Sequence, residues 1–309
     1  MPDPTPPPLG RRKFLRETGA AAVTAGAFLP AGAFSSPDRL TTISIIHTTD
    51  LHGHVLPTQT YDGVKDVGGL ARCASLIRRW REENPDHLLI DVGDLYQGTH
   101  LSYASRGRLM VELQNLLRYD AWVLGNHEFD WGIDVVEEVV GRSAAPVLTA
   151  NVKLGGKLAG ERGDDGSPLG RVAPWVIREI AGFRVGLVGV TTPGLQYWLP
   201  PDLLAGLEAV DPAEAVAAAA RELRELGVDT VVVAGHMGSR FGKDDFANRV
   251  DGLLTRSVGL IDAYIGGHTH RDLPSMRVQR ALYTQAGYFG IYLGRVDLTF
   301  DRETRKLVD

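Results

Sequence analysis

The chain has 309 residues, of which 44% are hydrophobic and 23% are charged, as in an ordinary soluble globular protein with one large domain or two small ones. Its formal net charge is −5 and its sequence pI is about 6.0. No basic surface is therefore expected to attract a nucleic-acid polymer or an anionic membrane, and the composition argues against a polyanionic partner.

The N-terminal segment, residues 1–38, has the pattern of an export signal followed by a linker. Arg11 and Arg12 are paired in a basic stretch, and an apolar run of small residues at 19–34 ends in A-G-A, which resembles a twin-arginine-type signal peptide with its cleavage site. This run is shorter than the ~20 residues that span a bilayer, so we expect no stable membrane span. We predict that the twin-arginine export machinery carries the protein across the cytoplasmic membrane; a disordered basic tail is the alternative.

Residues 39–309 are expected to fold as an α/β domain, because short apolar runs alternate there with amphipathic helical patterns. Strands are predicted at 42–48, 87–91, 121–124, 146–150, 185–190, 230–234, 263–265, 282–285 and 292–300. Helices are predicted at 69–83, 109–117, 133–140, 212–226 and 246–258. The segment 153–172, rich in Gly, Asp and Lys, is predicted to be a surface loop, and the last strands are predicted to form antiparallel ribbons.

Two residues with reactive side chains are predicted to be structural. Cys73 is the only cysteine and lies within the first helical pattern, so a buried core position is expected rather than a nucleophile. His47 lies within the first predicted strand and is expected to be buried.

Polar residues gather in five short segments, each directly after a predicted strand. These segments read T-T-D-L-H-G-H, D-V-G-D-L-Y-Q-G-T, G-N-H-E-F-D, A-G-H-M-G and I-G-G-H-T-H. A single Asp-x-His or His-x-His would more often be a turn or a structural histidine. Five such segments at the strand ends, where α/β sheets bind their ligands, favour a shared site. The donors that would converge are Asp50, His52, Asp94, Asn126, His236, His268 and His270.

This donor set indicates a metal centre. It consists of oxygen and imidazole donors without sulfur, a combination that suits Mn, Zn, Fe or Co and is too rich in nitrogen for Ca or Mg alone. Seven residues are too many for one ion that keeps a position open to substrate. Two divalent metal ions sharing one carboxylate would use all seven.

The order of these motifs resembles that of the calcineurin-like metallophosphoesterases, and within them the catalytic domain of the 5′-nucleotidase and 2′,3′-cyclic-nucleotide phosphodiesterase branch. The resemblance covers residues 43–300 and also includes V-G-G-L-A-R and Y-D-A-W-V-L-G-N-H-E-F-D-W-G. It implies an α/β fold with an α+β-like sandwich, in which two mixed β-sheets are flanked by helices in four layers. It also makes 39–309 the catalytic domain.

The resemblance assigns a role to each site residue. It implies that one metal is held by Asp50, His52, Asp94 and His270, and the other by Asp94, Asn126, His236 and His268. His127 and Asp130 are similar to the family's catalytic dyad. Asn126, His127 and Trp198 are expected to contact substrate, with plain packing as the alternative for Trp198. Glu128 is expected to face away from the metals and to cap or pack.

The implied activity is hydrolysis of phosphoesters, a small-molecule substrate class. The first expectation is a nucleotidase that releases phosphate from nucleoside 5′-monophosphates by in-line attack of a metal-bridging hydroxide. The alternatives are a 2′,3′-cyclic-nucleotide phosphodiesterase and 3′-nucleotidase, a UDP-sugar pyrophosphate hydrolase, or a non-catalytic metal-binding scaffold. Two-domain members of the family bind the base with a C-terminal domain, which is expected to be absent after Asp309.

Overall fold

The computed structural model describes residues 39–309, except 155, 159–167, 205, 241–242 and 244. The predicted signal peptide and linker at 1–38 lie outside the described residues. Within the part of the chain that is described, no helix is both long and apolar enough to cross a membrane.

The first sheet has five strands in the order β16-β1-β4-β5-β6. Its strands are β16 (Gly294–Asp301), β1 (Leu40–Thr48), β4 (His87–Asp91), β5 (Ala121–Val123) and β6 (Val147–Leu148). β1 pairs antiparallel with β16 and parallel with β4, and the pairs β4–β5 and β5–β6 are parallel. The parallel strands therefore place their carboxyl ends at one edge of the sheet.

The second sheet has six strands in the order β14-β15-β13-β12-β10-β9. Its strands are β14 (Asp272–Val278), β15 (Ala281–Ala286), β13 (Ala263–Gly266), β12 (Thr230–His236), β10 (Phe183–Thr191) and β9 (Trp175–Ile180). The four inner strands are parallel, and the two edge strands β14 and β9 run antiparallel to their neighbours. Both sheets are thus mixed, as predicted.

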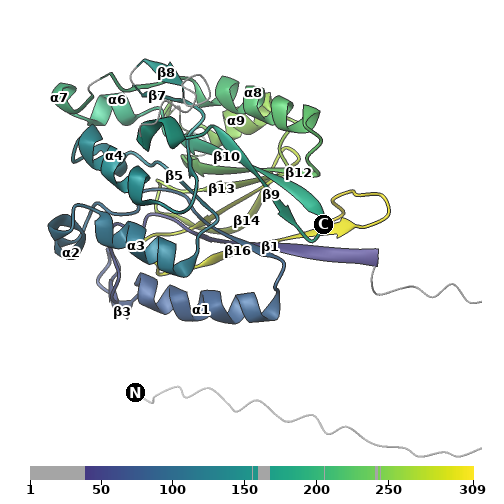
Figure 1. Ribbon diagram of the computed structural model, residues 1–309, viewed down its shortest axis with the longest axis horizontal. Coiled ribbons are helices and arrows are strands. Elements are labelled where there is room, and N and C mark those ends of the chain that lie inside the picture. The colour runs from purple at the N-terminus through teal and green to yellow at the C-terminus, as the bar shows by residue number, and fades with distance from the viewer. Residues whose placement is uncertain (1–38, 155, 159–167, 205, 241–242, 244) are drawn as a thin grey trace, which may run out of the picture. The chain divides into compact units, whose positions relative to one another are not determined.

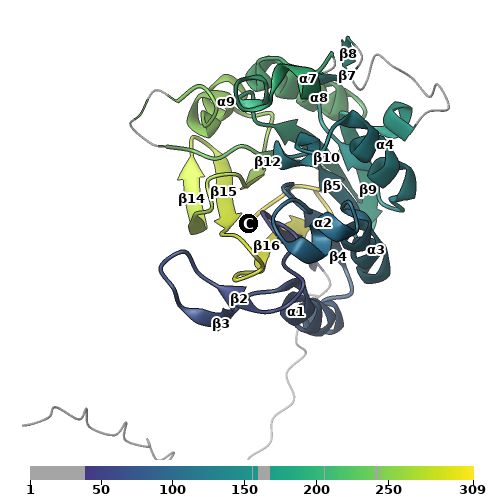
Figure 2. The ribbon, with the colours of Figure 1, turned by 90° about the vertical axis from the view of Figure 1, so that its left-hand side faces the viewer.

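Helices cover the outer faces of the two sheets (Figures 1 and 2). The helices are α1 (Leu70–Glu83), α2 (His100–Ala104), α3 (Arg108–Leu117), α4 (Ile133–Arg142), α6 (Leu195–Trp198), α7 (Pro201–Leu204), α8 (Pro212–Glu225) and α9 (Val250–Arg256), with short 3-10 turns η2 (His127–Phe129) and η3 (Pro168–Arg171). Helices α1, α3 and α4 pack on the first sheet, and α8 and α9 pack on the second.

The inner faces of the two sheets pack against each other in a third apolar cluster. Ile45 and Ile90 from the first sheet lie in it with Leu187, Val232 and Ile265 from the second. All five side chains are at most 1% exposed, so burial of apolar surface holds the sheets face to face. The resulting order of layers, helices, sheet, sheet and helices, confirms the predicted fold class.

Several local features differ from the sequence prediction. The strands β9 and β14 are missed, because both are edge strands of which neither has any fully buried residue. The segment 153–172 is not all loop: it contains β8 (Lys157–Leu158), most of β7 (Val152–Leu154) and the 3-10 turn η3. β7 also pairs with β11 (Glu208–Ala209), and a separate hairpin joins β2 (Thr58–Gln59) to β3 (Lys65–Val67).

The helix predicted at 246–258 is shorter, because α9 begins only at Val250. Side-chain oxygens of Asp245 accept hydrogen bonds from the backbone N–H of Ala247 and from the amide of Asn248. The Asp245 carbonyl also accepts the N–H of Asn248. These bonds form a local turn that competes with the first turn of the predicted helix.

Cys73 is buried on α1, where its thiol donates a 3.3 Å hydrogen bond to the carbonyl oxygen of Gly290. Burial raises the pKa of the Cys73 thiol to about 11. The prediction of a core residue is confirmed, since a buried thiol with a raised pKa is a poor nucleophile at neutral pH.

His47 is fully buried in β1, and neither of its ring nitrogens has a hydrogen-bond partner among the described residues. Its partner across the antiparallel ladder is Gly294, and a Cβ atom there would lie 1.9 Å from His47 Nε2. The glycine therefore leaves the space that the imidazole fills. Burial lowers the pKa of His47 to about 3, so the residue is neutral in the folded protein, and its predicted burial is confirmed.

The pH dependence of stability tests this buried neutral histidine. On unfolding its pKa returns from about 3 to ~6.5, so the unfolded chain binds one more proton between these values and stability falls with falling pH. Between pH 7 and pH 5 this costs about 2 kcal/mol. We expect His47→Leu to lose that part of the pH dependence of the unfolding free energy in urea denaturation. Ile45→Leu, which removes no titratable group, should keep the wild-type dependence; equal dependences in all three proteins would contradict the assignment.

Candidate metal centre and active site

The predicted ligands meet where strands of both sheets end. Asp50 and His52 follow β1, Asp94 follows β4 and Asn126 follows β5 in the first sheet. The second sheet supplies His236 at the end of β12, and His268 and His270 after β13. Six of the seven residues form two groups whose ligand atoms lie within 4.8 Å of one another: Asp50, His52 and His270 in the first group, and Asp94, His236 and His268 in the second.

Asp94 lies between the two groups. Its Oδ2 atom is 3.0 Å from His236 Nε2 of the second group and 3.6 Å from His52 Nε2 of the first. In the first group, His270 Nε2 is 3.2 Å from Asp50 Oδ1 and 3.1 Å from His52 Nε2. The two groups are therefore adjacent, and the Asp94 carboxylate is within reach of both.

Asn126 lies beside Asp94, because the turn that begins at Asn126 contacts the Asp94 carboxylate. The backbone N–H of His127 donates a 2.9 Å hydrogen bond to Asp94 Oδ1. A Cβ atom at Gly125 would lie 2.3 Å from the same oxygen, so only glycine lets this turn approach Asp94 so closely. Asn126 Oδ1 is buried and has no hydrogen-bond partner among the described residues.

The polar turns are held in strained backbone conformations. Asp50, His52, Asp94, His268 and His270 all have positive φ angles, between 46° and 72°. Left-handed backbone is uncommon for residues with a side chain, and it persists only where the surroundings enforce it. Five such residues in one cluster mark a site where side-chain direction matters more than local backbone energy.

Neighbouring groups orient the imidazoles. His52 Nδ1 and His236 Nδ1 each donate a 2.8 Å hydrogen bond to a backbone carbonyl, of Gln97 and Val92 respectively. The Nδ1 atom of His270 lies 2.8 Å from the hydroxyl of Tyr61. In each case the Nε2 atom is left facing the cluster, as is usual for histidines that bind metals.

In the second group a buried carboxylate lies next to buried imidazoles, and each shifts the pKa of the other. Burial raises the pKa of Asp94, but the adjacent imidazoles of His236 and His52 outweigh this effect and hold it well below its usual value. Burial lowers the pKa of His236, and the Asp94 carboxylate overcomes it and raises that pKa to about 10. At His268 burial prevails and lowers the pKa to about 4. Asp94 is therefore ionised and His268 neutral, the forms that bind metal ions, and binding at His236 would displace a proton.

These features fit two divalent metal ions. The two groups together offer carboxylate and imidazole donors, and Asn126 Oδ1 is a buried atom without a hydrogen-bond partner among the described residues. Such atoms are costly unless a ligand satisfies them. The structure thus provides two adjacent candidate metal sites of the predicted composition.

Glu128 is fully buried, and its carboxylate is bonded to backbone N–H groups of two turns. Its Oε2 atom accepts the backbone N–H of Asp94 (2.9 Å) and of Gly125 (2.6 Å), and its Oε1 atom accepts that of Leu95 (2.8 Å). One carboxylate thereby ties the turn after β4 to the turn after β5. The expectation that Glu128 caps or packs is confirmed.

His127 and Asp130 form a hydrogen-bonded couple at the site. His127 Nδ1 lies 2.6 Å from Asp130 Oδ2, across one turn of η2. Burial lowers the pKa of His127, but the Asp130 hydrogen bond and the Asp94 charge outweigh it and raise the pKa to about 9. The ring also lines a pocket of about 240 Å³, together with His52 and His270. This arrangement suits a group that gives a proton or a hydrogen bond to a ligand in that pocket.

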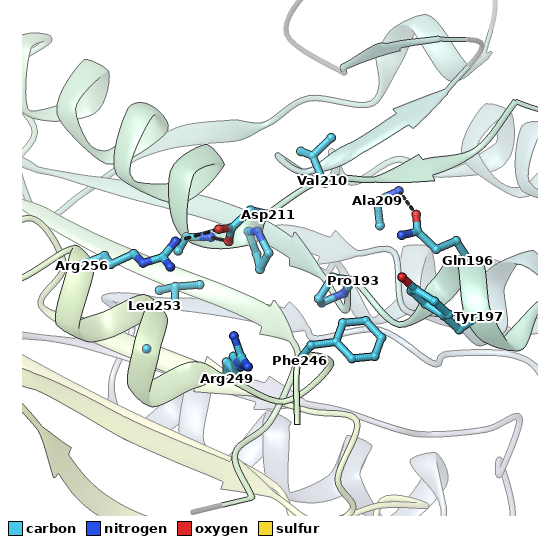
Figure 3. Close-up of a pocket in the computed structure, with 13 residues that line it drawn as sticks. Pro193, Gln196, Tyr197, Ala209, Val210, Asp211, Phe246, Arg249, Leu253 and Arg256 are labelled. Carbon is cyan, nitrogen blue, oxygen red and sulfur yellow. Dashed lines mark hydrogen bonds and ion pairs between the residues drawn. The ribbon is translucent and has the colours of Figure 1, made fainter. Parts of the chain in front are cut away.

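Trp198 lies at the rim of the second group. Its indole stacks on the His268 ring, with centroids 5.0 Å apart, and it remains 48% exposed. The adjacent Tyr197 instead lines a separate pocket of about 340 Å³, where its ring contacts Phe246 edge to face. Figure 3 shows this second pocket, which is lined by none of the predicted ligands and in which Asp211 and Arg256 form an ion pair.

An aromatic wall beside the first group is missed by the sequence prediction. It consists of Tyr61 on the turn between β2 and β3, and of Tyr288 and Phe289 after β15. The segment A-G-Y-F-G directly follows a predicted strand, so the rule that found the ligands could have found two of these residues. Tyr61 lies in a hairpin that gives no comparable signal.

Replacement of Glu128 tests its capping role. The amide of Glu128→Gln can accept only some of the three backbone N–H bonds, so at least one buried donor is left without a partner. This costs about 1–3 kcal/mol of stability. We expect the unfolding free energy in urea to fall by that amount. The control Glu112→Gln changes a glutamate on the surface of α3 and should stay within about 0.5 kcal/mol of wild type. Equal stabilities of the two variants would contradict the role of Glu128.

Comparisons with known proteins agree with this geometry. The chain is 32% identical over 322 residues to the snake venom 5′-nucleotidase of Crotalus adamanteus, covering 96% of this chain and 50% of that protein. It is 30% identical over 279 residues to the trifunctional nucleotide phosphoesterase protein YfkN of Bacillus subtilis, covering 82% of this chain and 18% of that protein. The chain thus spans about half the length, or less, of these relatives.

A solved structure and a family model support the same assignment. The crystal structure of the calcineurin-like phosphoesterase YfkN from Bacillus subtilis matches the fold with a TM-score of 0.73 and 28% identity, covering 87% of this chain and 89% of that chain. Residues 43–272 match the family model of the calcineurin-like phosphoesterases. The resemblance drawn from the motifs is confirmed: this chain belongs to the calcineurin-like phosphoesterase family.

Proposed function

We propose that the chain is a dinuclear metal-dependent phosphoester hydrolase that acts on nucleotides, releasing phosphate from nucleoside 5′-monophosphates. The observation that carries the proposal is the hydrogen-bonded couple of His127 and Asp130 in a pocket that His52 and His270 also line. The snake venom relative, named a 5′-nucleotidase, supports the choice of substrate. A non-catalytic scaffold would need the two metal groups but not this couple.

The proposed ligand sets are those implied by the motifs. One ion is assigned to Asp50, His52, Asp94 and His270, and the other to Asp94, Asn126, His236 and His268. When bound, Mn, Zn, Fe or Co ions would neutralise the phosphoryl charge and supply an activated water for in-line attack.

The roles of the protein's own groups follow from their hydrogen bonds. Asp130 holds the Nδ1 proton of His127, which leaves Nε2 to donate to the leaving oxygen of the substrate and to stabilise the charge that develops there. Asn126 is proposed to contact the phosphoryl group through the same turn. Trp198 is proposed to contact substrate from the rim above His268.

A second substrate class is favoured by one relative. The Bacillus subtilis YfkN protein, 30% identical to this chain, is named a trifunctional nucleotide phosphoesterase. Cyclic 2′,3′-nucleotides are phosphodiesters and 3′-nucleotides are phosphomonoesters, and both would present phosphoryl oxygens to the proposed metals. We therefore propose them as secondary substrates of the same site.

We also propose that the protein is exported. The support is the sequence of residues 1–38, with its Arg11-Arg12 pair and the apolar run that ends in A-G-A. The relative named a snake venom 5′-nucleotidase is consistent with export. The twin-arginine route would deliver the enzyme already folded.

Hydrolysis assays with matched variants test the proposed activity. We expect the purified chain, loaded with Mn or Zn, to release phosphate from adenosine 5′-monophosphate, and more slowly from 3′- and 2′,3′-cyclic nucleotides. His127→Ala should lower kcat by ~10²–10⁴-fold, as expected for loss of a general acid, while the metal content measured by atomic emission stays at the wild-type level.

The contrasting variant is His236→Ala, which should lose metal as well as activity because His236 is a proposed ligand. If His127→Ala also loses metal, its assignment as a catalyst is wrong. If the wild-type enzyme hydrolyses no nucleotide with any divalent metal, the nucleotidase proposal is wrong.

Export is tested by changing both arginines conservatively. Arg11→Lys with Arg12→Lys keeps the charge of the N-terminal segment, so a charge-driven route would be unaffected, whereas twin-arginine export should be blocked. We expect the double variant to accumulate in the cytoplasm at full length, as seen by cell fractionation and immunoblotting. Normal export of the double variant would point to another route.

A further inference from the structure

The pocket that holds His127 is bounded by aromatic side chains. Its volume is about 240 Å³, and Tyr61, Phe289 and His54 line it together with His127. This volume is a little below the ~300 Å³ at which pockets for drug-sized ligands begin. It has room for one flat ring system beside the first group, of which His52 and His270 line the same pocket.

Tyr61 offers an exposed ring held in a fixed orientation. Its hydroxyl lies 2.8 Å from His270 Nδ1, and the two rings are within 7° of parallel. Tyr288 stacks against both, with its centroid 4.5 Å from that of Tyr61 and 5.2 Å from that of His270. Tyr61 is nevertheless 67% exposed. A large apolar ring that is fixed by neighbours and still open to solvent is suited to contact a ligand.

Phe289 is strained in the same way as the predicted metal ligands. Its φ angle is 56°, a left-handed conformation that is a genuine outlier for a bulky residue. The backbone around it is fixed at both ends: Phe289 N–H donates to the Asp50 carbonyl (2.8 Å), and the Gly69 N–H donates to the Phe289 carbonyl (2.8 Å). The ring stacks on His54, with centroids 3.8 Å apart. Strain at this position points to a functional side chain.

We propose that Tyr61 and Phe289 form the subsite for the leaving group, where the base of a nucleotide stacks on Tyr61 while His127 faces the bond that breaks. The inference rests on the proposed function and adds the place where the base of the leaving group would bind. Trp198 stacks on His268 and does not line this pocket. The principal stacking partner of the base is therefore Tyr61.

Two substrates that differ only in the base test this subsite. Adenosine 5′-monophosphate and ribose 5-phosphate present the same phosphomonoester, and only the first can stack. We expect Tyr61→Leu to raise the KM for the nucleotide by about 5- to 150-fold, the range produced by the loss of one base–aromatic stack. The KM of Tyr61→Leu for ribose 5-phosphate should stay within about twofold of the KM of Tyr61→Phe for the same substrate.

The Tyr61→Phe variant separates the ring from the hydroxyl. It keeps the stacking face and loses the contact with His270 Nδ1, so both substrates should be affected equally and the ratio of their kcat/KM values should stay at the wild-type level. The matched control is Tyr103→Leu, which removes a tyrosine that is equally exposed (66%) but lies on α2 outside this pocket. That ratio should not change in the control.

A binding measurement separates this inference from the proposed activity. Adenosine has no phosphoester, so its affinity for the metal-loaded protein, measured by calorimetry, reports stacking without turnover. We expect Tyr61→Leu to weaken adenosine binding and Tyr61→Phe to preserve it. The subsite is wrong if the wild-type protein hydrolyses ribose 5-phosphate and Tyr61→Leu changes neither the ratio of the two kcat/KM values nor the affinity for adenosine. If Trp198→Leu alone loses both the preference for the nucleotide and the affinity for adenosine, the base lies at the rim beside His268 and the proposed subsite is also wrong. If the wild-type protein shows no turnover but binds adenosine, and Tyr61→Leu loses that binding, the proposed function is wrong and the subsite is supported.

Discussion

The site depends on one carboxylate, that of Asp94, which reaches both metal groups. Its Oδ2 atom faces His236 and His52, and its Oδ1 atom accepts the N–H of His127. Since the backbone N–H of Asp94 is bonded to Glu128, the same residue is fixed from the opposite side as well. The distance between the two metal groups and the position of the proposed catalytic histidine are therefore set by the placement of one side chain.

The fold supplies this placement through two sheets rather than one. Asp50, His52 and Asp94 come from the first sheet, and each metal group is completed by histidines of the second. The apolar layer between the sheets, in which Ile45 and Leu187 are fully buried, holds the two halves together. Part of the energy of that packing offsets the strain of the positive φ angles, which cost on the order of 1–3 kcal/mol each.

Much of this arrangement could be predicted from the sequence, because polar turns after parallel strands converge at one sheet edge. All seven predicted ligands lie in that region, and Glu128 caps as expected. Prediction from apolar periodicity failed at two kinds of segment: β9 and β14 lack buried residues, and Asp245 replaces the first turn of a helix by a side-chain turn. The stacking of Tyr61 on Tyr288 joins residues 227 positions apart, so no window of sequence could show it.

The split of each metal group between the sheets also couples metal binding to the fold. In the first group His270 of the second sheet faces Asp50 of the first, and in the second group His236 faces Asp94. Without a cation, Asp50 and Asp94 bring two negative charges into a buried site, where imidazoles and hydrogen-bond donors such as the His127 and His268 N–H groups compensate them. An ion bound in either group would reduce the repulsion between these carboxylates and would take its ligands from both sheets. Its binding free energy would therefore also contribute to the association of the sheets and to the stability of the fold.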